Sequence, residues 1–278
     1  MTHIDQRLTL DIADLSLTLL DDAPVASEWL RDRCASYHTK KTDAAASTTL
    51  AVRRNPDFVM GADMLVAELG DAPGSFWIRG VDFIARRRRC GLPVEVEAHP
   101  EAGMAGILRW VVSALLLEQG GLLLHSMSYS YEGSGIVCAG PSGRGKTTLA
   151  RLLAQQVTLF TDETTAIQRV GDAVVAHATP FAGELGIVSG PASAMLDAIF
   201  LLRHAPQTQV RRLSAAEAVT QLLGCTFAPL RSGVWMNACL EAVEHLARSV
   251  PCYDLCFRPE VNVWETLQDA CHRTVPAA

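Results

Sequence analysis

Long uninterrupted hydrophobic runs are missing from this chain of 278 residues. Its most apolar stretch, Gly106–His125, is broken by Arg109, Glu118 and a Gly-Gly pair, which leaves it too interrupted to cross a bilayer. We therefore expect no membrane span. The N-terminus, MTHIDQRL, has neither the basic start nor the apolar core of a signal peptide, so we expect a cytoplasmic location.

Clustered cysteines and an excess of basic residues are also absent. The eight cysteines include no CxxC pair, which is typical of reduced thiols in the cytosol. The net charge is −6, so the electrostatic footprint of a nucleic-acid-binding protein is missing. Hydrophobic residues make up 49% of the chain, which excludes general disorder and predicts a globular protein. The sequence leaves the oligomeric state open, a homo-oligomer included.

The strongest functional signal is the run GPSGRGKT at residues 140–147. The pattern G-x-x-x-x-G-K-[ST] folds as a strand, a glycine-rich loop and a helix N-terminus whose backbone N–H groups point at an anion. The lysine brings positive charge to the phosphate oxygens, and the Thr147 hydroxyl can bind Mg²⁺. The motif predicts a nucleotide-binding loop made of Gly140, Pro141, Ser142, Gly143, Arg144, Gly145, Lys146, Thr147 and Thr148.

Two adjacent acids, Asp162 and Glu163, follow the loop's helix after the short apolar segment 157–161. Because the linker is so short, we expect this segment to return as a parallel strand beside the loop's own strand and to bring both acids near the phosphates. One acid could hold Mg²⁺ while the other takes a proton from an incoming hydroxyl or water, as phosphoryl transfer requires. Alternatively, the acids only begin a polar turn.

The hydrophobic periodicity changes near residue 100 and predicts two domains. Region 1–100 should be a small, mostly antiparallel α+β domain, with a hairpin at 7–20, a helix at 24–37 and strand candidates at 48–52, 75–85 and 93–98. Region 101–278 should be the nucleotide-binding domain, with helices at 102–118, 146–155, 214–223 and 237–249 and strands at 122–131, 135–139, 157–161, 164–170, 173–178, 198–202 and 252–257. The first region could recognise an acceptor or brace the second.

Several segments of the second region together resemble the HPr kinase/phosphorylase-like branch of the phosphoenolpyruvate carboxykinase superfamily. The segments are LLLHSMSYSYEGSGIVCAGPSGRGKTTLARLL, LFTDETTAI, TPFAGELGI, AIFLL, RRLSAAEAV and VPCYDLCFRPEVNVWETL, within about residues 100–268. The resemblance implies an α/β fold with a P-loop-containing, carboxykinase-like core of mixed sheet and helices. It also implies a kinase that uses ATP and Mg²⁺ on a hydroxyl, expected to be serine, of a peptide or small protein.

The same resemblance assigns roles to individual residues. Asp162 would be the general base, Glu163 would hold Mg²⁺ with Thr147, and His125 matches a histidine on the strand before the loop. A histidine on an apolar strand could instead be a core residue, and the spacing of His125 alone does not distinguish the two roles. Glu184 could add a metal or substrate contact, or be a solvent-facing acid.

Two departures from the family pattern leave the acceptor's identity open. HPr kinases carry Asp-Asp where this chain has Asp162-Glu163, and residues 181–187, FAGELGI, replace their acid-x-Arg-Gly-Leu-Gly-Ile stretch. Related stand-alone kinases resemble tailoring enzymes that act on peptide hydroxyls, and this chain is as similar to those kinases as it is to the HPr enzymes.

Phosphoryl transfer also needs a cation near the migrating group. The candidates, which sequence cannot rank, are Arg144, Arg203, Arg211, Arg212 and Arg231. The basic run Arg86–Arg89 could receive an acidic peptide or protein partner, or be a solvated loop with ion pairs to the abundant carboxylates. A nucleotide-driven transport ATPase or switch, and a nucleotide-binding scaffold without chemistry, are the competing functions. The chain has no LSGGQ-like signature, which argues against the transport ATPase.

Overall fold

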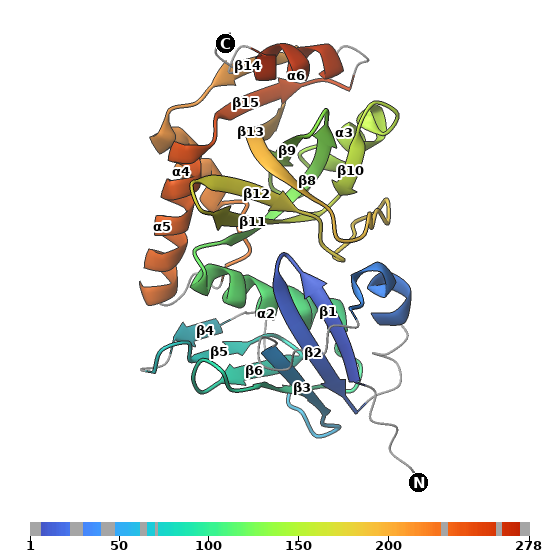
Figure 1. Ribbon diagram of the computed structural model, residues 1–278, viewed down its shortest axis with the longest axis vertical. Coiled ribbons are helices and arrows are strands. Elements are labelled where there is room, and N and C mark those ends of the chain that lie inside the picture. Colours follow the sequence, from blue (N-terminus) through green and yellow to red (C-terminus); the bar gives the residue numbers. More distant parts are fainter. Residues whose placement is uncertain are drawn as a thin grey trace. The chain divides into compact units, whose positions relative to one another are not determined.

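The computed structural model describes residues 7–22, 30–39, 48–61, 66–69, 72–228, 233–259 and 263–272. The chain divides into two compact units: Met1–Gln119 with Ala228–Cys239, and Gly120–Phe227 with Leu240–Ala278. Each unit contains a β-sheet accompanied by helices, so the fold is a mixed α/β fold dominated by sheet (Figure 1). In the part of the chain that the structure describes, no helix is both long and apolar enough to cross a membrane.

A seven-stranded sheet, in the order β1-β2-β3-β7-β6-β5-β4, forms the first unit. Its strands are β1 (Arg7–Ile12), β2 (Leu15–Asp21), β3 (Thr48–Arg54), β4 (Val66–Leu69), β5 (Phe76–Arg79), β6 (Phe83–Arg87) and β7 (Val94–Ala98). Neighbouring strands are antiparallel except for the pairs β2·β3 and β3·β7, which confirms the mostly antiparallel prediction. Alternate residues of β5, β6 and β7 are buried because successive side chains of a strand point to opposite faces.

Helix α2 (Met104–Glu118) contacts β2 and β6 and therefore lies in the first unit. Sequence periodicity places the helix correctly at 102–118 but assigns it to the second region. An apolar helix face shows that a helix is buried and does not say which sheet it covers. Of the helix expected at 24–37, residues 24–29 lie outside the described residues; residues 30–33 are helical, and Ala35–Tyr37 form a 3₁₀ turn, η1.

The second unit contains an eight-stranded sheet in the order β10-β8-β11-β12-β13-β15-β14, with β9 pairing to β8 and β13. Its strands are β8 (Leu122–Tyr131), β9 (Ser134–Ala139), β10 (Thr158–Thr161), β11 (Thr164–Val170), β12 (Ala173–His177), β13 (Ser193–His204), β14 (Gln209–Arg212) and β15 (Cys252–Phe257). The remaining helices are α3 (Lys146–Leu153), α4 (Ala215–Leu223), α6 (Val263–His272) and α5 (Gly233–Ser249), which belongs to the first unit up to Cys239 and to the second from Leu240. Every strand and helix expected in region 101–278 is confirmed, whereas β14 and α6 were not expected.

Strand β10 does not lie beside the loop's strand, so the expected parallel neighbour is wrong. Strand β8 lies between the two and runs antiparallel to both: its Tyr129 pairs with Leu159 of β10 on one side and with Ile136 of β9 on the other. The edges of β9 are already taken by its hairpin partner β8 and by the parallel strand β13. The returning strand therefore pairs one position further along the sheet.

One apolar cluster holds α3 against this sheet. Leu149 and Leu153 of α3 pack in it with Phe200 and Leu202 of β13 and with Phe257 of β15. The loop that precedes α3 is thereby fixed over the ends of β9, β13 and β15. This packing sets the position of the candidate site.

Candidate functional site

The loop between β9 and α3 has a backbone that requires glycine at two positions. Gly143 and Gly145 have φ values of 79° and 92°, in the left-handed region that residues other than glycine rarely adopt. A Cβ on Gly145 would also lie 2.7 Å from Cζ of Phe257. Helix α3 begins at Lys146, and the first N–H groups of a helix have no intrahelical acceptor. The loop therefore offers donors to an anion.

The Lys146 side chain lies back over this loop. Its Nζ donates hydrogen bonds to the carbonyl oxygens of Gly140, at 2.7 Å, and Pro141, at 3.1 Å. Burial lowers the pKa of Lys146, and the nearby Cys225 and Glu163 oppose that shift. An ammonium has three donors, so the two carbonyls leave one for a phosphate oxygen.

Asp162 lies in the turn between β10 and β11 and is only 2% exposed. Its Oδ1 accepts a hydrogen bond from the backbone N–H of Gly183, at 2.9 Å, and its Oδ2 accepts one from that of Leu185, at 2.7 Å. Glu163 beside it is half-buried, and its backbone N–H donates to Thr161 Oγ1 at 3.2 Å. The aspartate thus fixes the segment that carries Glu184, which is exposed.

The loop, the acids and this segment surround one cavity of about 330 Å³. The lining contains the following residues that the sequence predicts: His125, Ser142, Gly143, Gly145, Lys146, Thr147, Thr148, Asp162, Glu163 and Glu184. Gly140 and Pro141 contribute the carbonyls that hold Lys146, and Arg144 is exposed on the loop. The two acids therefore line one pocket with the glycine-rich loop, although the strand order that brings them there differs from the one expected.

His125 is half-buried on β8 and lines the same cavity. Its backbone N–H donates to the carbonyl of Cys225 at 2.7 Å, and its own carbonyl accepts from the N–H of Gly140 at 3.3 Å. Its ring lies 5.7 Å from that of Phe227. The residue therefore ties the start of the loop to β8 and also presents its ring to the pocket.

Two residues of the lining were not expected from the sequence: Gly183 and His204. His204 is the last residue of β13, and its Nε2 lies 2.6 Å from the carbonyl oxygen of Gly143. A single histidine far along the chain from the motif carries no spacing signal. Gly183 could have been suspected only from its place beside Glu184 in a glycine-containing turn.

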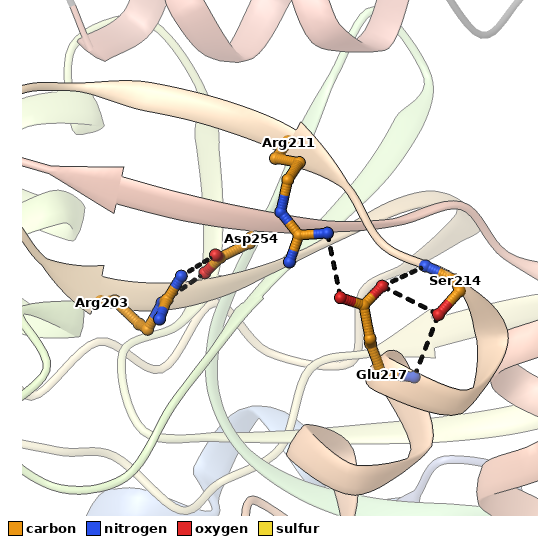
Figure 2. A network of polar contacts seen from close by, with 5 residues as sticks. All are labelled: Arg203, Arg211, Ser214, Glu217 and Asp254. Atoms are coloured by element: carbon orange, nitrogen blue, oxygen red, sulfur yellow. Dashed lines mark hydrogen bonds and ion pairs between the residues drawn. The ribbon is translucent and has the colours of Figure 1, made fainter.

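Most of the candidate arginines are engaged elsewhere. Figure 2 shows Arg203 bound through two hydrogen bonds to the buried carboxylate of Asp254, and Arg211 paired with Glu217 at 3.0 Å. Arg212 lies over the ring of Tyr253, 5.2 Å from its centroid. Among the described residues no arginine lines the cavity. Arg231 lies outside the described residues.

The basic run Arg86–Arg89 lies in the first unit, at the end of β6. Arg87 is 4% exposed and forms an ion pair with Glu118, and its Nε donates to the carbonyl of Gly74 at 2.5 Å. The three other arginines are exposed. The expected ion pair to a carboxylate is therefore present at Arg87, whereas the expected solvation of that side chain is wrong, because it is buried.

A family model described as "SynChlorMet cassette protein ScmC" matches residues 102–272, more than half of the chain. The chain belongs to the ScmC family. The matched region of this ScmC family member begins at α2, ends with α6 and contains every residue that lines the cavity.

No curated protein matches the chain. Among solved structures, the Hpr(Ser) kinase/phosphatase from Coxiella burnetii matches with a TM-score of 0.31 and 11% sequence identity, over 54% of this chain and 95% of that one.

Proposed function

We propose that the chain is an ATP-dependent kinase that transfers the γ-phosphoryl group to a hydroxyl, in the first instance serine, of a peptide or small protein. One observation carries the proposal: the P-loop and the carboxylates of Asp162 and Glu163 line the same cavity. The loop provides donors and a lysine for polyphosphate, and the acids provide the base and metal ligand that a kinase needs. The relationship to HPr kinase/phosphorylase-like enzymes is part of the same proposal.

The residues present suit Mg²⁺ held together with a nucleotide. Among the described residues no group of three or more His, Cys, Asp or Glu side chains is placed to hold a metal. That agrees with Mg²⁺, which usually binds through one or two protein oxygens together with phosphates and water. Thr147 and Glu163 line the cavity and would be its ligands, with Glu184 at the rim as a further one. When bound, Mg²⁺ would neutralise charge on the phosphates.

In the proposed reaction Asp162 takes the proton of the acceptor hydroxyl. The acceptor oxygen forms a bond to the γ-phosphorus, the bond between that phosphorus and the β–γ bridging oxygen breaks, and ADP leaves. Each carboxylate oxygen of Asp162 accepts one backbone hydrogen bond and keeps a second lone pair for the hydroxyl. His125 and Lys146 would face the charge that develops on the transferring group.

The test begins with purified protein, γ-labelled ATP and Mg²⁺. The word cassette in the family description supports seeking the acceptor among serine-containing peptides and small proteins encoded beside this gene. Label should pass to one of these acceptors. Lys146→Ala should weaken both ATP binding and transfer, because the lysine contacts the phosphates in either state. ATP turnover without any labelled acceptor would instead favour an ATPase switch, and binding without turnover would favour a scaffold.

A further inference from the structure

The chemistry of Gly143 determines which atom donates in its hydrogen bond with His204. The oxygen of Gly143 is a carbonyl, which can only accept, so the Nε2 atom 2.6 Å away must carry the hydrogen. The N–H of the same peptide, that of Arg144, points to the carbonyl of Pro141 at 3.4 Å. Both ends of the Gly143–Arg144 peptide plane are therefore held.

His204 is exposed, but its ring has a buried aromatic neighbour. It stacks on the ring of Phe257, with centroids 6.3 Å apart and an interplanar angle of 28°. Phe257 is 1% exposed and belongs to the cluster that packs α3 against the sheet. The Cε1 atom of His204 would lie 3.4 Å from a Cβ on Gly145. The ring thus contacts the loop at Gly143 and occupies space that a side chain at Gly145 would meet.

The alternation of β13 separates His204 from the arginine before it. Arg203 points to the face where it pairs with Asp254, whereas His204 shares a face with Leu202, which packs with α3. Figure 2 shows Arg203 directed at that carboxylate. His204 is therefore the side chain at this strand end that faces the loop.

We propose that His204 is a positioning residue of the nucleotide site. Its Nε2–H holds the Gly143 carbonyl away from the phosphate cradle, because a carbonyl turned inward would present partial negative charge to the anion. The loop is thereby arranged for polyphosphate before a ligand binds. This inference rests on the proposed function only in that the ligand is a polyphosphate, and it does not depend on phosphoryl transfer.

The experiment compares His204→Ala, His204→Gln and His204→Asn with the wild type. The side-chain amide of glutamine reaches the Nε2 position, whereas that of asparagine reaches only the Nδ1 position. Affinities for inorganic pyrophosphate and for ATP with Mg²⁺ are measured by calorimetry, and Tm is recorded for every variant. We expect His204→Ala and His204→Asn to lower the affinity for both ligands about three- to tenfold, which is the effect of one hydrogen bond. The affinities of His204→Gln should remain within about twofold of those of the wild type.

The outcomes separate the inference from the proposed function. If wild type binds and all three variants bind equally well, or if affinity falls only in step with Tm and glutamine does not rescue it, His204 has no positioning role. Wild-type protein that binds neither pyrophosphate nor ATP would overturn the nucleotide site and the inference together. Binding with the expected order of variants but without transfer to any acceptor would sustain the inference and reject the kinase.

Discussion

The carboxylate of Asp162 accepts a hydrogen bond of 2.9 Å from the backbone N–H of Gly183. Its other oxygen accepts from Leu185, so the side chain proposed as base also anchors the segment that carries Glu184. Proton transfer needs a negative charge on Asp162, whereas anchoring needs only acceptor oxygens. Substitutions that remove the charge and the oxygens separately therefore distinguish the two roles.

Asp162→Asn should lower phosphoryl transfer by about 100-fold or more, the range for loss of a general base, while ATP affinity changes only a few-fold. The amide retains one acceptor oxygen and turns its NH₂ group towards the other backbone donor. We expect the free energy of unfolding to fall by about 1–2 kcal/mol for the buried N–H that loses its acceptor. Label transfer, calorimetry and urea unfolding measure the three effects.

Asp172→Asn is the matched control for this substitution, because Asp172 is exposed in the hairpin turn between β11 and β12. It should behave as wild type in all three measurements. An Asp162→Asn protein that loses transfer and ATP binding to the same extent would argue that Asp162 only shapes the pocket. Asp162→Ala, which removes both acceptors, should be less stable than the asparagine variant.

Gly183→Ala tests the close approach of the anchored segment to the acids. A Cβ at this position would lie 2.8 Å from Oδ2 of Asp162 and 3.1 Å from Cβ of Glu163, so the segment must shift. We expect transfer to fall at least tenfold through displaced carboxylates, with a smaller effect on ATP affinity. Activity assays and calorimetry check this.

Gly106→Ala in α2 provides the contrast, since nothing lies within 4 Å of a Cβ there. Alanine is favoured over glycine inside a helix by about 1 kcal/mol, so this variant should be slightly more stable than wild type and equally active. Equal activity of Gly183→Ala and wild type would mean that the Gly183 segment does not position the acids.

The local structure of the chain could be predicted because periodicity and motif are local signals. The alternation of 122–131 gives β8, and the P-loop pattern gives the turn before Lys146. The partner of β10 could not be predicted, because strand order depends on which sheet edges are already paired. Strand β14 was missed because its four residues, QVRR, are too short and too charged to show alternation.

The candidate site could be predicted where its residues fall within the motif or immediately follow it. Lys146, Asp162 and Glu163 are of this kind, and all three line the cavity. His204 is contributed by the end of a distant strand, and the anchoring of Gly183 by Asp162 is a tertiary hydrogen bond between segments 21 residues apart. Neither contact can be predicted from the spacing of residues in the sequence.

Glu217 should make the stability of the second unit depend on acid pH. Hydrogen bonds from the backbone and side chain of Ser214, followed by one from Arg211, lower the pKa of Glu217 from 4.5 to about 2 (Figure 2). A carboxyl whose folded pKa is depressed stabilises the fold fully above its unfolded pKa and loses that effect as pH falls towards the folded pKa. The wild type should therefore have a higher Tm than Glu217→Gln near pH 6.

That difference in Tm should shrink as the pH is lowered from about 4.5 towards about 2, and salt should reduce it because the group is exposed. Glutamine can still accept the capping bonds at the start of α4, so the comparison isolates the charge. Glu241→Gln, an exposed position on α5, is the control. A difference that does not change with pH would show that the carboxylate charge contributes nothing.

The ion pair between the buried Arg87 and the partly exposed Glu118 should stabilise the first unit more than a fully exposed ion pair would. Arg87 binds both carboxylate oxygens of Glu118 and lies 4.8 Å from the centroid of the Phe76 ring. Arg87→Met leaves the carboxylate of Glu118 without its partner, but that side chain is 25% exposed and partly solvated, so the free energy of unfolding should fall by about 1–2 kcal/mol. Burial already raises the pKa of Glu118, and loss of the arginine removes the interactions that lower it.

Because protonation of Glu118 is then favoured in the folded state, the deficit of Arg87→Met should diminish as the pH falls. The double variant Arg87→Met/Glu118→Gln should recover part of the lost stability, since no unpaired charge remains. Urea unfolding of the wild type, Arg87→Met, Glu118→Gln and the double variant at pH 7 and pH 5 gives the coupling free energy directly. Additive effects of the two substitutions at both pH values would show that the pair contributes no more than an exposed ion pair does.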